Sequence, residues 1–174
     1  MNDRCYYFHN EEVKLFDDAQ KKCSEIFKKH GFYNGRLYEP KDLENFTKVY
    51  ELAEKFSMKP ELQLWLGLND KLKDGQFVYN SNNERPKFKA PFAGYYKSFS
   101  QNEKNNIKFS PKQPNGKTTE NCLITFKLNN EDRPMWFDRP CIENDAIDEV
   151  GHRFICEFNV PHQTYCIYIR KVNS

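Results

Sequence analysis

The sequence has no long apolar segment, and this absence excludes one class of protein at once. No window approaches the ~20 apolar residues that a membrane-spanning helix requires, and hydrophobic residues make up only 38% of the chain. The net charge of +2 gives the whole chain no strong attraction to nucleic acid or to a membrane surface. We therefore expect no membrane span and no nucleic-acid partner. Aromatic residues reach 16%, so Phe, Tyr and Trp must form much of the core.

Motifs of common enzymes and of zinc sites are absent as well. The chain has no HExxH motif and no serine elbow. Its histidines are scattered: they are His9, His30, His152 and His162. No two cysteines form a CxxC pair, and none combines with histidine at zinc-finger spacing. We expect that the chain is not an enzyme.

Six cysteines, spread along the chain, indicate the compartment. They are Cys5, Cys23, Cys122, Cys141, Cys156 and Cys166. Their even number and wide spacing favour three disulfides in an oxidising compartment, although fifteen pairings are open on spacing alone. Residues 1–5 contain no apolar signal-peptide core, so either a signal was removed or the protein is cytosolic. The cysteines favour a secreted, extracellular protein. Only in such a protein would the sequon Asn45-Phe46-Thr47 be a site for N-glycosylation.

Hydrophobic periodicity predicts two helices early in the chain and strands later. Apolar residues recur at helical spacing over residues 13–30 and again over about 41–56. Shorter apolar runs predict strands at 5–9, 62–68, 76–79, 122–127, 135–137, 153–158 and 165–170. This order favours an α+β fold. With no repeat and no linker, we expect a single domain over 1–174, with a core at about 5–158 and a C-terminal extension at 159–174.

Residues 81–121 differ in character from the rest of the chain. They are rich in Asn, Lys, Pro and Ser without sustained periodicity, and a loop this long inside a compact domain usually has a function. Aromatic residues alternate there with a basic set, namely Arg85, Lys87, Lys89, Lys97, Lys104, Lys108 and Lys112. Either the aromatics pin the loop while the cations are solvated, or the segment binds sulfated or carboxylated glycans.

Several motifs, in the right order, resemble those of one protein family. They are FDDAQKKC (16–23), LWLGLND (64–70), QPN (113–115), Glu120 before Cys122, WFD (136–138) before Cys141, and RFICEF (153–158). Together they are similar to the C-type lectin-like domains, over roughly Cys5 to Phe158. The resemblance implies two helices flanking small antiparallel sheets, with a long irregular loop region at about 81–121.

The resemblance also implies which cysteines are paired in disulfides. The family pairing joins Cys23 to Cys156 and Cys122 to Cys141. Cys5 and Cys166 are left, and a bond between them agrees with chain ends that lie side by side in that fold. This third bond is not a standard one of the family.

A calcium and carbohydrate site in the long loop is a further implication. The family takes ligand oxygens from both residues beside the motif proline, from a downstream Glu, and from an Asn-Asp pair after the Trp. The matching residues that bear oxygen are Gln113, Asn115, Glu120 and Asp138, and these would bind both the metal and the sugar. Phe137 stands where the family has Asn, so one ligand is lost. We expect one Ca²⁺ site at most, weakened, which Phe137→Asn should restore.

Two functions follow from these observations, beside a third in which the chain is a structural or adhesive protein without a ligand. The first is a secreted carbohydrate-binding lectin, which binds glycans or glycoproteins through calcium. The second is a calcium-independent module of the same fold, which binds a protein or a sulfated or acidic polyanion, such as a sulfated polysaccharide, through the basic loop. QPN is a hybrid of the family's EPN and QPD motifs, so the sugar stays open.

Overall fold

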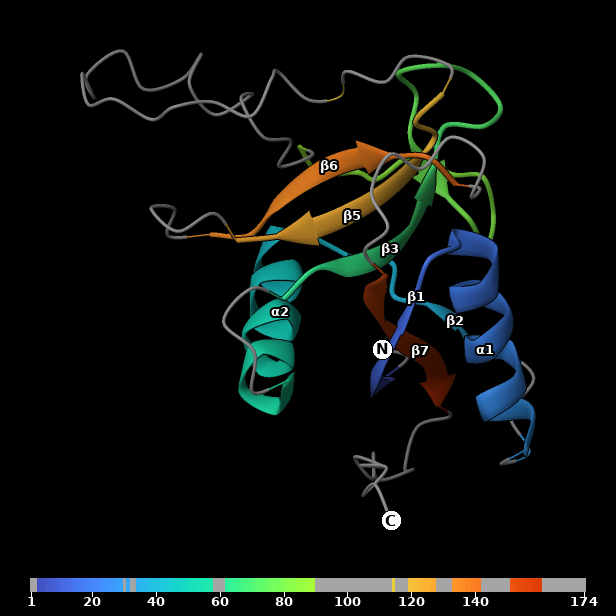
Figure 1. Ribbon diagram of the computed structural model, residues 1–174, viewed down its shortest axis with the longest axis vertical. Helices are drawn as coiled ribbons and strands as arrows, with labels where there is room; N and C mark the ends of the chain where they lie inside the picture. The colour runs from blue at the N-terminus through green and yellow to red at the C-terminus, as the bar shows by residue number, and fades with distance from the viewer. Residues whose placement is uncertain are drawn as a thin grey trace.

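The computed structural model describes residues 3–29, 31, 34–57, 62–89, 114, 119–127, 133–141 and 151–160. Two helices and seven strands follow one another along these residues (Figure 1). The order is β1 (Asp3–Val13), α1 (Phe16–Lys29), β2 (Arg36–Leu37), α2 (Leu43–Ser57), β3 (Leu64–Asn69), β4 (Val78–Tyr79), β5 (Cys122–Phe126), β6 (Met135–Arg139) and β7 (His152–Val160). Helices early and strands late confirm the predicted α+β class.

The described strands form one mixed sheet in the order β1-β7-β3-β5-β6, with β2 paired to β7 and β4 paired to β3. All pairs are antiparallel except β3 with β7. The resemblance implied small antiparallel sheets, and the described strands agree with this except for the parallel β3–β7 pair, which links them into one sheet. The β3–β7 pair connects two parts of the sheet. One part is the β1–β7 ribbon, which is formed by the two ends of the described chain, and the other consists of β3, β5 and β6.

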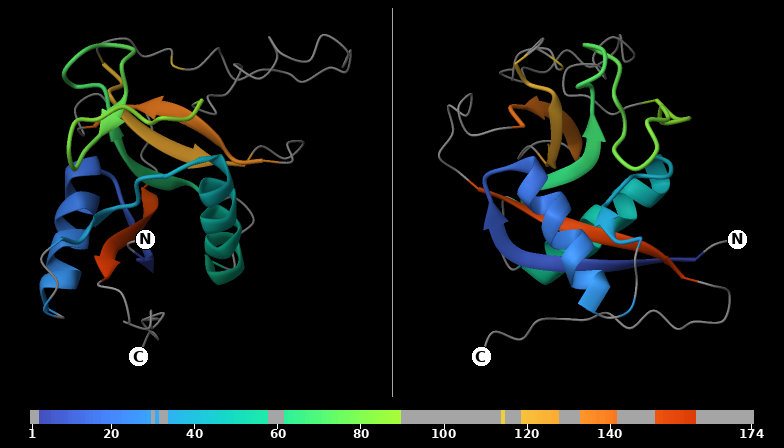
Figure 2. Two further views of the ribbon diagram at one scale, coloured as in Figure 1. Left: turned by 180° about the vertical axis from the view of Figure 1, so that it is seen from behind. Right: turned by 90° about the vertical axis from the view of Figure 1, so that its right-hand side faces the viewer.

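The two helices lie on either side of the β1–β7 ribbon (Figures 1 and 2). In α1 the buried residues Phe16, Ala19, Cys23 and Phe27 recur at spacings of three and four, which places them on one face. The helix ends before Gly31, whose φ of 82° and N–H bond to the Lys28 carbonyl (3.1 Å) form a left-handed cap.

Helix α2 begins after Asp42, whose carboxylate accepts the Asn45 N–H at 2.8 Å. One core cluster lies between α1 and the sheet and contains Phe16 and Trp65. A second contains Phe46 of α2 and Trp136 of β6. The core is therefore largely aromatic, as the composition predicts.

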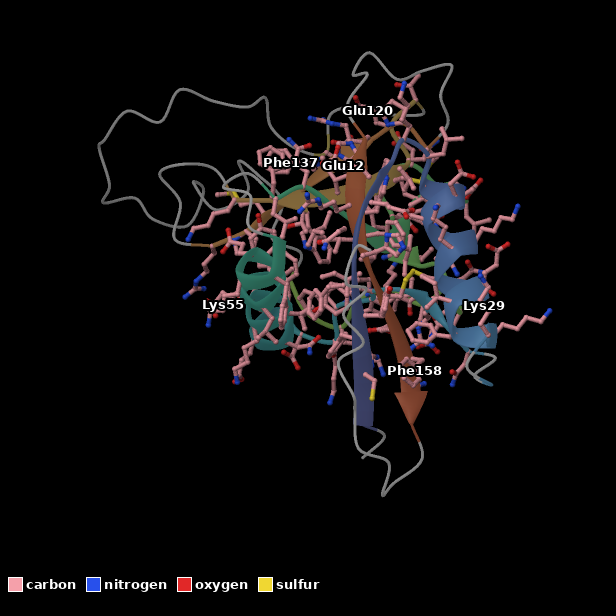
Figure 3. All side chains as sticks on the ribbon, turned by 60° about the horizontal axis from the view of Figure 1, so that its bottom comes forward. Glu12, Lys29, Lys55, Glu120, Phe137 and Phe158 are labelled. Atoms are coloured by element: carbon pink, nitrogen blue, oxygen red, sulfur yellow. A yellow bond between two sulfur atoms is a disulfide. The ribbon has the colours of Figure 1, made fainter. Side chains whose placement is uncertain are left out.

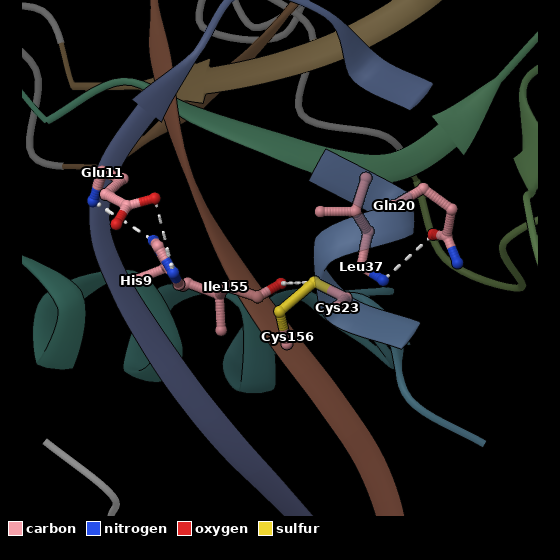
Figure 4. Close-up of a disulfide and its surroundings, with 7 residues drawn as sticks. All are labelled: His9, Glu11, Gln20, Cys23, Leu37, Ile155 and Cys156. Carbon is pink, nitrogen blue, oxygen red and sulfur yellow. Dashed lines mark hydrogen bonds and ion pairs between the residues drawn. A yellow bond between two sulfur atoms is a disulfide. The ribbon is translucent and has the colours of Figure 1, made fainter. Parts of the chain in front are cut away.

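Two of the predicted disulfides are confirmed. Cys23 of α1 is bonded to Cys156 of β7 (S–S 2.02 Å), and Cys122 of β5 is bonded to Cys141 beyond β6 (2.12 Å). Figure 4 shows the first bond between the helix and the strand. Cys5 is also disulfide-bonded. Its predicted partner, Cys166, lies outside the described residues, as does the predicted strand at 165–170, so the third pair stays a prediction.

Candidate functional site

The start of β5 and the end of β6 bring two predicted calcium ligands to one end of the sheet. Cys122 is paired with Arg139, and Leu123 with Asp138, so Glu120 and Asp138 belong to the same end of this strand pair. Figure 3 shows Glu120 at the end of the molecule away from Phe158. The other two predicted ligands, Gln113 and Asn115, lie outside the described residues.

A further carboxylate, which the sequence reasoning did not select, lies at this end. Asp70 follows β3 directly and is only 2% exposed. Its N–H donates to the carbonyl of Asn121, the neighbour of Glu120, at 3.0 Å. An acidic residue directly after a strand whose residues are mostly apolar is the signal in the sequence that could have identified it.

The surroundings of Asp70 are unfavourable to its charge. Oδ2 accepts the Gly75 N–H at 2.7 Å, whereas Oδ1 is buried with no hydrogen-bond partner in the described part of the structure. Burial raises the pKa of Asp70, and the negative charges of Asp74 and Asp138 raise it further, against the hydrogen bond from Gly75. Asp74 and Asp138 are therefore each close enough to disfavour the charge of Asp70, which is an environment suited to a cation.

Asp70 also organises the turn that follows β3. Its carbonyl accepts the Lys73 N–H at 3.0 Å, and the Lys73 carbonyl accepts the Gln76 N–H at 2.9 Å. Gly75 completes the turn with a φ of 73°, a conformation that L residues rarely adopt. The carboxylate is thus held in place by the backbone on both sides.

Phe137 is directed away from this site. Successive side chains of a strand point to opposite faces, so Phe137 lies on the face opposite to Asp138. Its ring is fully buried and stacks on Phe126 with centroids 4.0 Å apart. The expectation that Phe137→Asn restores a ligand is therefore revised, because the replacement would place an amide in the apolar core.

The donors present fit a calcium ion in chemistry, since Ca²⁺ prefers carboxylate and amide oxygens. Among the described residues, however, no group of three or more His, Cys, Asp and Glu is arranged to hold a metal. A complete site therefore needs Gln113 and Asn115 in addition to Glu120 and Asp138. The buried, unsatisfied Oδ1 of Asp70 favours a nearby cation, because a buried charge without a partner is costly.

Comparison with known proteins identifies the fold. No family model matches the chain. The human C-type lectin domain family 3 member A is 25% identical to it over 161 residues, which cover 92% of this chain and 62% of that protein. The C-type lectin CEL-I from Cucumaria echinata superimposes with a TM-score of 0.61 at 18% identity, over 90% of this chain and 91% of the lectin. The chain has the C-type lectin-like fold.

Other proteins of this fold have different roles. Herring type II antifreeze protein superimposes on the C-type lectin-like domain with a TM-score of 0.54 at 21% identity, over 92% of this chain and 94% of that one. The fold alone therefore does not determine the ligand. The chain spans about 62% of the length of the curated relative. None of its described helices has the length and apolar character to cross a membrane.

The C-type lectin-like domain also presents part of the predicted basic surface. Arg85, Lys87 and Lys89 are exposed, whereas Pro86 and Phe88 between them are half-buried. The remaining basic residues of the loop lie outside the described residues: they are Lys97, Lys104, Lys108 and Lys112.

Proposed function

We propose that this C-type lectin-like domain is a secreted carbohydrate-binding lectin that uses one calcium site and catalyses no reaction. The observation that carries the proposal is the group of carboxylates where β3 and β6 end. Asp70 and Asp138 are 2% and 1% exposed, and the negative charge of Asp138 helps to raise the pKa of Asp70, whose burial is the main cause of the rise. A divalent cation would offset the cost of burying both charges.

Glu120 and Asp138 would hold the ion together with Gln113 and Asn115, while Asp70 adds negative charge beside Asp138. Bound calcium would supply a centre that coordinates sugar hydroxyls. The remaining lone pairs and N–H groups of the same side chains would accept and donate hydrogen bonds to those hydroxyls. These four side chains supply few oxygens for an ion that takes about six to eight, so we expect weak binding. The disulfides favour an oxidising compartment, where glycans and glycoproteins are available partners.

Calorimetric titration with calcium tests the metal site. Wild type should bind one ion, and Asp138→Asn should weaken binding at least about tenfold, because one ligand charge is lost. Asp18→Asn, at an exposed position of α1, is the matched control and should bind as wild type does. Two bound ions, or unchanged binding by Asp138→Asn, would contradict the ligand assignment.

Asp70→Asn gives an independent readout without any metal. In EDTA this variant should be more stable than wild type, because it removes the repulsion from Asp74 and Asp138 while its amide oxygen can still accept the Gly75 N–H. In calcium wild type should gain more stability than the variant, because the lost charge weakens binding of the ion and tighter binding stabilises the folded protein more. Equal stabilities in both buffers would show that the carboxylates do not interact with a cation.

A further inference from the structure

We propose that Arg85, Lys87 and Lys89 form a row of cations that binds sulfated polysaccharide without calcium. We call residues 85–89 the basic row. This binding goes beyond the calcium site and does not depend on it.

Alternating exposure is the first observation. Along the basic row the side chains alternate between exposed (Arg85, Lys87, Lys89) and half-buried (Pro86, Phe88). The three cations therefore share the solvent side, and the two apolar residues face the protein. Between Ser81 and Lys89 the only acidic residue is Glu84, so the segment carries a net positive charge.

The row is attached to the core through Phe88, its fourth residue. The Phe88 ring meets the fully buried Trp136 edge-to-face, with centroids 5.7 Å apart. Trp136 is itself packed in the same way on Phe46 of α2 at 5.8 Å. Seen from behind, the yellow-green segment that ends at Lys89 runs across the β5–β6 end of the sheet (Figure 2, left).

The start of the segment is fixed by polar contacts. The N–H and hydroxyl of Ser81 donate to the buried carboxylate of Glu39 at 2.8 and 2.7 Å. The Tyr79 N–H donates to the Glu84 carbonyl at 2.8 Å, and Asn83 closes this turn with a φ of 58°. Because the segment is fixed near Ser81 and again at Phe88, it loses little conformational freedom when it binds a ligand, and this favours affinity.

The charges of Arg85 and Lys87 remain available to a ligand, and Lys89 is exposed to solvent. The Arg85 guanidinium donates to Gln76 Oε1, a neutral acceptor that orients it without cancelling its charge. Within the described residues no carboxylate forms an ion pair with Arg85 or Lys87.

The geometry selects the kind of partner. Residues two apart in a chain are at most about 7 Å apart, so the three cations lie within about 14 Å in a line. A line of cations matches a linear polymer with repeated anionic groups better than a single phosphate. Arg and Lys form strong charge-assisted hydrogen bonds with such groups. Disulfides favour an oxidising compartment, where sulfated polysaccharides rather than nucleic acids are the linear polyanions.

Binding to heparin, measured by calorimetry in EDTA, tests the proposal. For three charge contacts, affinity should fall about 30-fold or more between about 50 and 200 mM salt. The variant Arg85→Gln/Lys87→Gln/Lys89→Gln should bind at least about tenfold more weakly at the lower salt. The control Lys21→Gln/Lys29→Gln/Lys55→Gln loses the same charge at exposed positions on the two helices and should bind almost as wild type does. Lys29 and Lys55 are labelled in Figure 3.

Each other outcome overturns the proposal. Equal losses in the two triple variants would show that only net charge matters. Heparin binding that EDTA abolishes would place the polysaccharide at the calcium site instead. A DNA duplex that competes as well as heparin at equal charge would show that the partner class is wrong. Near-UV circular dichroism checks the fold, and Lys87→Glu alone should still weaken binding if the triple variant unfolds.

Discussion

Replacing Phe137 by asparagine separates packing from calcium ligation at the end of β6. The ring is 0% exposed and stacks on Phe126. Truncating a buried Phe costs about 3–5 kcal/mol. Asparagine fills part of the space, but its buried amide costs about 1–3 kcal/mol where it finds no partner. We expect Phe137→Asn to lower the free energy of unfolding by about 4 kcal/mol, a large share of the roughly 5–15 kcal/mol typical of a domain.

Urea unfolding followed by tryptophan fluorescence, with and without calcium, measures this loss. Phe137→Leu is the control, because it keeps an apolar side chain and should cost only about 1–2 kcal/mol. Calcium should stabilise Phe137→Asn no more than it stabilises wild type. The reasoning is refuted if Phe137→Asn unfolds within about 1 kcal/mol of wild type and binds calcium more tightly, since its side chain would then face the ligands.

Three more predictions follow from the buried polar groups and the disulfides. Burial raises the pKa of Glu157 from 4.5 to about 7, against the opposing effect of Arg4 and Arg36. The folded state therefore binds this proton more tightly than the unfolded state does. The free energy of unfolding, measured by urea titration, should fall by about 3 kcal/mol between about pH 5 and pH 8. A free energy of unfolding that does not change with pH would contradict this prediction. The side-chain amide of Asn45 donates to the Tyr6 hydroxyl at 3.0 Å and accepts from the Tyr38 hydroxyl at 2.9 Å, so the folded protein uses the group that a glycan would need. Peptide mapping of protein from a eukaryotic secretory host should therefore find Asn45 without glycan in the folded fraction. A fully glycosylated folded fraction would contradict this prediction. Cys23→Ala/Cys156→Ala opens a loop with a sequence separation of 133 and should cost about 5 kcal/mol in the chain-entropy model, so an unchanged urea midpoint would refute that role.

Local patterns predicted the helices well because their buried residues repeat within a few turns. The start of α1 was predicted too early, since Val13 obeys the helical spacing but is paired with His152 in β1 and β7. The strand predicted at 5–9 extends over Asp3–Val13, because β7, far along the chain, pairs with most of its length. β2 has two residues and exists only through its pairing with β7, so no local signal marks it.

The candidate site was predictable only in part, for the same reason. Glu120 and Asp138 follow from the family motifs, and their common position follows from the β5–β6 register. Asp70 joins them through a contact with Asn121, which lies 51 positions later in the chain, and the sequence does not display this contact. Strand alternation alone indicates that Phe137 and Asp138 face opposite sides, and the structure shows that core packing occupies the Phe137 side.

Retention on immobilised neutral monosaccharides, with calcium and then with EDTA, tests the central claim most directly. Wild type should be retained by at least one sugar in calcium and released by EDTA, and Asp138→Asn should not be retained in either buffer. Retention that persists in EDTA, or no retention of any neutral sugar in calcium, would contradict a calcium-dependent lectin.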